Sequence, residues 1–145
     1  MTRSIPEVRT WRAVRGRRAA LAAALAVLVG AAILGAALPA PFKGGDKISV
    51  ALMGLPVAAV LLLLARPSIT ASDEGLVVRN LVGTRRLSWA EVVSIRLGPD
   101  DSWASIDVAD GTALAVMALQ AADRRHTEAA LADLRARQAA HEPRG

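Results

Sequence analysis

Two long runs of apolar residues occupy the first half of the chain. No charged residue interrupts positions 19–42, and a second uncharged run covers 48–65. At about 1.5 Å per helical residue, each run is long enough to cross a hydrocarbon core of about 30 Å. Prolines, glycines and three charged residues separate the two runs. The pattern predicts two transmembrane helices, about 19–39 and 48–65, joined by a short extracytoplasmic loop.

Cations before the first apolar run set the expected orientation. Residues 1–18 form a basic arm with six arginines and one glutamate, whereas the loop between the runs holds two lysines and one aspartate. Because cations concentrate on the cytoplasmic side, both termini are expected in the cytoplasm, at the inner cell membrane. Trp11 is expected at the membrane interface. The cations expected at the membrane surface, where they set topology and attract anionic lipid, are Arg12, Arg15, Arg17, Arg18 and Arg66.

A cleaved secretory signal is the alternative interpretation of the first apolar run. An arginine-rich start, an apolar stretch and small residues around 37–40 match the outline of a signal peptide. Cleavage there would export the rest of the chain. The long basic segment and the second apolar run that follows at once favour two anchors over a removed signal.

After Pro67 the pattern changes to alternating apolar and polar residues, interrupted by turn signals every eight to ten residues or so. This is typical of a small antiparallel sheet or barrel. In the clearest strand, Val93, Ile95 and Leu97 are expected on one face. The expected strands are 68–72, 76–80, 85–88, 92–97, 103–108 and 112–117.

The end of the chain has a helical composition. A narrow apolar stripe over about 121–140 predicts one helix that covers one end of the sheet. Residues 141–145 are expected to fray. The soluble domain is therefore expected to cover 67–140, and Trp89 is expected in or near its core.

Charge and cysteine content exclude several classes of function. Residues 67–145 carry a net charge of −2, so the basicity of the chain belongs to its membrane-proximal part. A nucleic-acid-binding domain needs a concentrated cationic face, so no nucleic-acid partner is expected. The absence of cysteine excludes disulfides, thiolate nucleophiles and cysteine-based metal sites.

The polar residues of the domain form no recognisable active site. The acids at 100–101, and Asp107 with Asp110, are spaced as turn formers and lack the further oxygen ligands of a metal loop. His126 and His141 are far apart and have no cysteine or base partner. No glycine-rich phosphate loop follows a strand. No catalytic residue, metal ligand, cofactor or small-molecule substrate is therefore expected.

Four short segments carry a resemblance to a known family. In this order, they resemble the bacterial pleckstrin-homology (PH-like) domain family, and most closely its membrane-anchored group named after low molecular weight protein antigen 6. The resemblance covers about 67–138 and implies a bent antiparallel barrel plugged by a C-terminal helix, used for binding or scaffolding without catalysis. Six strands are expected here, one fewer than in the usual barrel. The segments are 75–80, 87–92, 110–111 and 118–123.

The expectation is an α+β membrane protein in which a two-helix hairpin precedes a PH-like β-barrel capped by one helix. It would display this domain at the cytoplasmic face as a protein-interaction or assembly module, through Trp103 or the edge of strand 76–80, with Arg79, Arg85 and Arg86 as further contacts. One alternative is an anionic-lipid sensor that uses Arg66 with the same three arginines, although the acidic turn at 73–75 opposes phosphate. The other is an exported PH-like antigen after signal cleavage.

Overall fold

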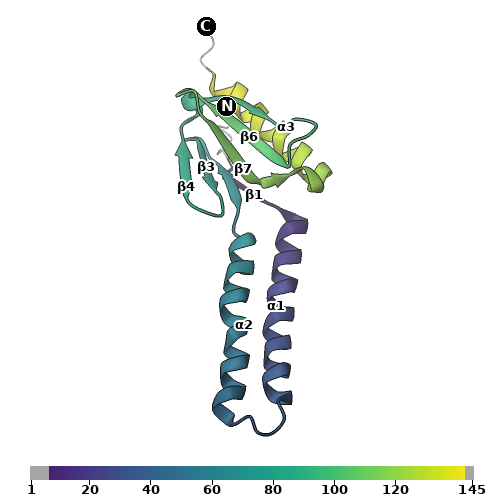
Figure 1. The fold of residues 1–145 in the computed structure, drawn as a ribbon. Helices are drawn as coiled ribbons and strands as arrows, with labels where there is room; N and C mark the ends of the chain where they lie inside the picture. The colour runs from purple at the N-terminus through teal and green to yellow at the C-terminus, as the bar shows by residue number, and fades with distance from the viewer. Residues whose placement is uncertain (1–6, 143–145) are drawn as a thin grey trace. The chain divides into compact units, whose positions relative to one another are not determined.

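The computed structural model of the protein describes residues 7–142 and forms two compact units (Figure 1). One unit contains residues 16–66. The other combines the chain up to Arg15 with the chain from Pro67 onward. Residues 1–6 of the basic arm and residues 143–145 of the tail lie outside the described residues. The domain is thus assembled from two separate pieces of sequence.

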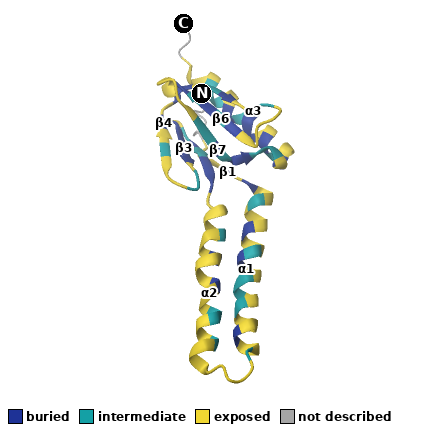
Figure 2. Ribbon diagram, viewed as in Figure 1, coloured by how far each residue is buried: buried dark blue, intermediate teal, exposed yellow. Residues whose placement is uncertain are grey.

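The unit of residues 16–66 is a hairpin of two helices. Helix α1 spans Val14–Ala37 and α2 spans Gly44–Leu64, so α1 begins five residues earlier than the expected span. Both helices are long and apolar enough to cross a membrane. Only 17% and 11% of their most apolar stretches are buried (Figure 2), whereas a core helix of a soluble protein would be mostly covered.

Small residues line the contact between these two helices. A Cβ atom added to Gly54 would lie 2.8 Å from the Cβ atom of Ala31, and one added to Gly35 would lie 2.5 Å from the carbonyl oxygen of Lys47. Small residues let helix backbones approach closely, which is how helices associate in lipid. The large apolar side chains point away from the contact and are exposed, among them Leu25, Ile33, Leu34, Leu52, Met53 and Val60.

A four-stranded antiparallel sheet forms the first layer of the domain, in the order β1-β2-β3-β4. Strand β1, Arg9–Arg12, precedes α1 in the sequence and pairs with β2, which follows α2. The helical hairpin is therefore inserted between two neighbouring strands. The other strands are β2 Ser68–Ala71, β3 Leu76–Arg79 and β4 Thr84–Leu87.

Strand β1 changes two of the sequence expectations. The arm at 1–18 was expected to be only a basic membrane-proximal segment, but residues 9–12 are part of the sheet. Trp11 was expected at the membrane interface, but it is buried in the domain core opposite Ile69. Its indole belongs there because it completes the apolar inner face of the sheet. With β1, the described residues of the domain contain seven strands, one more than the sequence predicts, and the additional strand comes from before the helices.

A three-stranded antiparallel sheet and a helix complete the domain. The sheet has the order β5-β6-β7, with β5 Val92–Arg96, β6 Trp103–Val108 and β7 Ala113–Gln120. Helix α3 spans Arg124–His141. The two sheets remain separate and do not close into the barrel that was expected. The short helices η1, Trp89–Glu91, and η2, Ala121–Asp123, lead into β5 and α3.

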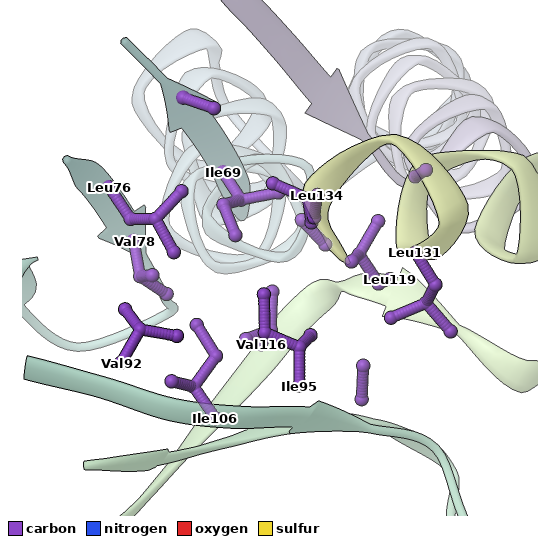
Figure 3. Close-up of a cluster of buried hydrophobic side chains, with 14 of the residues drawn as sticks. Ile69, Leu76, Val78, Val92, Ile95, Ile106, Val116, Leu119, Leu131 and Leu134 are labelled. Atoms are coloured by element: carbon purple, nitrogen blue, oxygen red, sulfur yellow. The ribbon is translucent and has the colours of Figure 1, made fainter. Parts of the chain in front are cut away.

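The core lies between the two sheets and α3 (Figure 3). Ile69 and Val78 of the first sheet face Ile106 and Val116 of the second, and Leu134 of α3 closes the cluster. All five side chains are almost completely buried. The alternating pattern of the sequence predicts these positions because strands with one buried face place every second residue inside.

Two local details differ from the sequence pattern. A register shift in β5 turns Val93 outward, so Val92 and Ile95 face the core in its place. Such a bulge adds one residue to one strand and breaks the strict alternation. His141 was assigned to the frayed tail, but it ends α3, and its ring stacks on Trp89 with 5.0 Å between ring centroids.

The expected turns are present. Gly75, Gly83 and Gly111 all have positive φ angles and lie between successive strands. Gly75 is the most constrained, because a Cβ atom there would collide with the carbonyl oxygen of Leu87. Only glycine fits such a position. Trp89 is buried, as expected, and its indole N–H donates to the carbonyl oxygen of Ser72 at 2.9 Å.

Candidate functional site

The outer face of the four-stranded sheet carries a group of arginines. In the register of the sheet, Arg12, Ser68, Arg79 and Thr84 follow one another across the four strands. Arg86 lies diagonally from Arg79, where side chains on one face are about 7–8 Å apart. We call this surface the arginine face. Its outward residues are Thr10, Arg12, Ser68, Thr70, Val77, Arg79, Thr84 and Arg86, of which Ser68 is buried.

The arginine face has no internal charge compensation. Among residues 7–142, no carboxylate lies within 4.0 Å of the guanidinium of Arg12, Arg79 or Arg86. None of its eight outward residues is acidic. The nearest acids along the strands, Asp73 and Glu74, follow the other end of β2. Arg12 and Arg79 therefore lie at the end of the sheet away from these acids, whereas Arg86 lies nearer to them and lines one shallow pocket together with Glu74.

Arg85, which was grouped with Arg79 and Arg86 in the sequence, has a different position. It lies in the cross-strand row of Ile69 and Val78, on the inner side of the sheet, at its edge. Its guanidinium donates to the carboxylate of Asp110 at 2.9 Å. Arg85 thus links the two sheets and is already paired.

The acids of the second sheet are held by neighbours. Asp110 accepts hydrogen bonds from the hydroxyl and the backbone N–H of Thr112, which lower the pKa of its carboxyl, with a further contribution from Arg85. Ser94 and then Arg96 lower the pKa of Asp107 in the same way. Arg96 donates to Asp107 through two nitrogens, at 3.0 and 3.2 Å. The outer face of this sheet is consequently close to neutral.

Trp103 occupies the outer face of the second sheet. Its side chain is 40% exposed, opposite the buried Ala104, Ile106 and Val108, as the sequence predicted. Trp103 is therefore on a different sheet from Arg79 and Arg86, and the structure does not combine them into one surface. Strand β3 has a neighbour on both sides, so the edge that was expected to bind a partner there is not available.

Side chains cover two of the sheet edges. Gln138 donates to the carbonyl oxygens of Val92 and Val93 at 3.0 Å, which satisfies the outer edge of β5. Asn80 donates to the carbonyl oxygen of Ala115 at 2.7 Å and accepts from the N–H of Met117 at 3.2 Å. The amide of Asn80 thus replaces a neighbouring strand for part of β7.

Asp123 is a polar contact that sequence reasoning missed. Its carboxylate is only 3% exposed and accepts the backbone N–H groups of Val14 at 2.8 Å and Arg15 at 3.1 Å. These are the first two residues of α1. The first N–H groups of a helix have no partner within it, so Asp123 caps α1 from a site far away in sequence. No local signal links position 123 to position 14.

Two of the remaining candidate polar groups, Asp101 and His141, form structural contacts. The buried Nε2 atom of His126 has no hydrogen-bond partner among the described residues. Asp101 accepts the backbone N–H of Gly98 at 2.8 Å and closes a turn. His141 stacks on Trp89, and His126 is on the first turn of α3. Within residues 7–142, no three His, Cys, Asp or Glu side chains gather in a geometry that could hold a metal ion.

Comparison with known proteins identifies the second half of the chain. Residues 66–137 match the family model described as "Bacterial PH domain". The chain is 37% identical over 102 residues to "Uncharacterized protein Rv1417" of Mycobacterium tuberculosis (strain ATCC 25618 / H37Rv) and to "Uncharacterized protein Mb1452" of Mycobacterium bovis. These alignments cover 70% of this chain and 66% of each relative. No solved structure matches.

Proposed function

Because residues 66–137 belong to the bacterial PH domain family, we propose that the chain is a multi-pass protein of the inner cell membrane that displays this domain in the cytoplasm. The domain serves as a non-catalytic protein-interaction or assembly module. Its two apolar helices also agree with the membrane-anchored group named after low molecular weight protein antigen 6, to which we assign it.

The pairing of β1 with β2 is the observation that carries this proposal. Arg12 lies opposite Ser68 in the sheet, although both helices separate them in sequence. Two paired strands must lie on the same side of a membrane, so the chain between them crosses it an even number of times. Two exposed apolar helices meet this condition with one crossing each.

The same pairing disfavours the export alternative. Signal cleavage around 37–40 would separate β1 from the rest of the domain. The sheet would lose its first strand, and the core would lose Trp11, which is 6% exposed. An intact first span is therefore part of the proposed function.

Single-cysteine labelling tests the topology without background, because the chain has no cysteine. Gly45→Cys lies in the first turn of α2, where a Cβ atom meets no neighbour within 4 Å. Ala113→Cys is an exposed position of the domain. We expect a membrane-impermeant maleimide to label position 45 in intact cells stripped of outer layers, and position 113 only after permeabilisation. Labelling of position 113 before permeabilisation would refute the cytoplasmic placement.

Trp103 is the proposed contact for a protein partner, because an exposed indole combines apolar area with a polar N–H group. A photoreactive amino acid at position 103 should form a discrete crosslinked band in living cells. The matched control is position 93, where Val93 is also exposed on the second sheet. The same bands at both positions would indicate non-specific contact and contradict this role of Trp103.

A further inference from the structure

We propose that the free edge of β4 binds an extended, acidic segment of a partner protein, which adds a strand to the four-stranded sheet. This inference rests on the proposed role of the domain as an interaction module, and it adds a second surface and a class of partner. The site lies entirely within the domain, on Thr84–Leu87, and does not involve Trp103, which is on the other sheet.

Strand β4 is the last strand of the first sheet and pairs only with β3 (Figure 1). The N–H of Asn80 donates to the carbonyl oxygen of Gly83 at 3.1 Å, which makes these two residues a hydrogen-bonded pair. Such pairs alternate along an antiparallel ladder, so Arg85 also bonds to β3. The backbone N–H and C=O groups of Thr84 and Arg86 therefore point away from β3, toward the outer edge.

Each of the other sheet edges has a neighbour. Gln138 hydrogen-bonds the edge of β5, Asn80 covers part of β7, and β1 contacts β7. Within residues 7–142, no side chain hydrogen-bonds the outward backbone groups of Thr84 or Arg86. An exposed row of unpaired backbone groups is the template on which an extended segment adds a strand.

The charge of this edge selects an acidic segment. Side chains of an added strand that lie directly opposite Thr84 and Arg86 would be on the arginine face. Among residues 7–142, no carboxylate lies within 4.0 Å of Arg86, although Glu74 lines the same pocket. An acid opposite Arg86 would supply this missing partner at the cross-strand distance of about 4.5–5.5 Å between Cβ atoms.

A second copy of this chain suits the edge less well. Two β4 strands paired antiparallel along their length would place either Arg85 or Arg86 directly opposite itself. Like charges in that position destabilise a pair of strands. The edge therefore favours a different chain with the opposite charge.

An apolar pocket at the Thr84 end of β4 favours apolar residues between the acids. The pocket has a volume of about 230 Å³, and its lining includes Val78, Val82 and Leu114. Val82, in the turn before β4, is 95% exposed. Successive side chains of a strand alternate between the two faces, so every second one would lie on the inner side, toward this pocket. The partner segment therefore alternates acidic and apolar residues.

A capped peptide that alternates valine and glutamate, with a fluorescent label, is the probe. It is added to the full-length protein in detergent, and binding is measured by fluorescence anisotropy. In antiparallel pairing the glutamates lie opposite Thr84 and Arg86, so the N–H groups of the glutamates point toward β4. N-methylation of the glutamates should therefore weaken binding about tenfold. N-methylation of the valines is the matched control and should preserve binding.

Charge variants and amide hydrogen exchange locate the bound peptide. Arg86→Gln should weaken binding up to about fivefold, because it removes the cross-strand ion pair. Arg124→Gln removes the same charge from α3 and should have no effect. The bound peptide should slow hydrogen exchange at the free N–H groups of Thr84 and Arg86, and not in the exposed turn at Asp100.

Several results would overturn the inference. Equal losses with the two methylated peptides would show that backbone pairing is not involved, and equal binding of a peptide with lysine in place of glutamate would show that charge does not select the segment. No binding at millimolar peptide would also refute it. Protection of Thr84 and Arg86 that rises with protein concentration in the absence of peptide would assign the edge to a second copy. None of these results changes the labelling at positions 45 and 113 or the crosslinks at position 103, which test the proposed function separately.

Discussion

The buried carboxylate of Asp123 holds the first turn of α1 through two backbone N–H groups. A missing cap costs about 0.5–2 kcal/mol. We therefore expect Asp123→Ala to lower the free energy of unfolding by that amount, and to accelerate amide hydrogen exchange at Val14 and Arg15. Asp123→Asn keeps an oxygen acceptor and should lose less. Equal losses in the asparagine and alanine variants would show that Asp123 stabilises the protein through its charge and not through its hydrogen bonds to the first turn of α1.

Asp110 predicts a pH dependence. Thr112 and Arg85 hold the pKa of its carboxyl below the ordinary value of 3.8. The charged form is therefore favoured in the folded state, and its contribution to stability is complete above the ordinary pKa and is lost as pH falls through the lower folded value. Asp110→Asn keeps a good turn residue before Gly111. We expect it to be less stable than the wild type at neutral pH and equal to it in strong acid, measured by urea unfolding in detergent. A difference that does not change with pH would contradict this.

At the scale of single residues, the sequence predicts inward and outward positions well where a strand alternates. Trp103 and its neighbours are examples. It does not distinguish Arg85 from Arg86, because that requires the register of β3 with β4. It also does not predict that Val93 faces outward, because a bulge depends on the neighbouring strand.

At the scale of elements, the close contact between α1 and α2 gives a direct test of the hairpin. Gly54→Leu would place a large side chain where even a single added Cβ atom would lie 2.8 Å from the Cβ atom of Ala31. We expect the helices to separate and the free energy of unfolding in detergent to fall by about 1–3 kcal/mol. Gly30→Leu is the matched control, because a Cβ atom there has no neighbour within 4 Å. Equal effects of the two substitutions would show that this contact does not hold the hairpin.

Elements differ in how visible they are in the sequence. The two apolar helices, the turns at Gly75, Gly83 and Gly111, and α3 have local signals. Strand β1 has none, because Arg9–Arg12 is only four residues long and three of them are polar. Its partner strand begins at Ser68, beyond both helices, so no local pattern indicates the pair. For the same reason, the sequence pattern predicts only a role in membrane topology for the arginines of this segment.

At the scale of the whole molecule, the insertion of the hairpin predicts that the domain can be made soluble. Replacing residues 16–66 with a short Gly/Ser linker joins the two pieces of the domain at the boundary between the units. We expect this variant to fold in water and to unfold cooperatively with denaturant. A variant that starts at Ala13 and carries the same deletion lacks β1 and Trp11, and should aggregate or unfold. Equal folding of the two variants would mean that β1 is dispensable.

The family match covers 66–137, so it contains six of the seven strands and omits β1. The family match therefore rests on the larger of the two pieces of the domain, the chain from Pro67 onward. The arginine face could not be predicted, because Arg12 comes from one piece and Arg79 and Arg86 come from the other.

The pairing of β1 with β2 has a consequence for a chain that is cut. A single break in the loop between α1 and α2 would leave one fragment with β1 and α1 and another with all other elements. The sheet and the shared core would still join them, so the two halves could be produced as separate polypeptides and assemble in the same bilayer. The protein is in this sense a natural candidate for a split reporter whose reconstitution requires both halves to be inserted in one membrane.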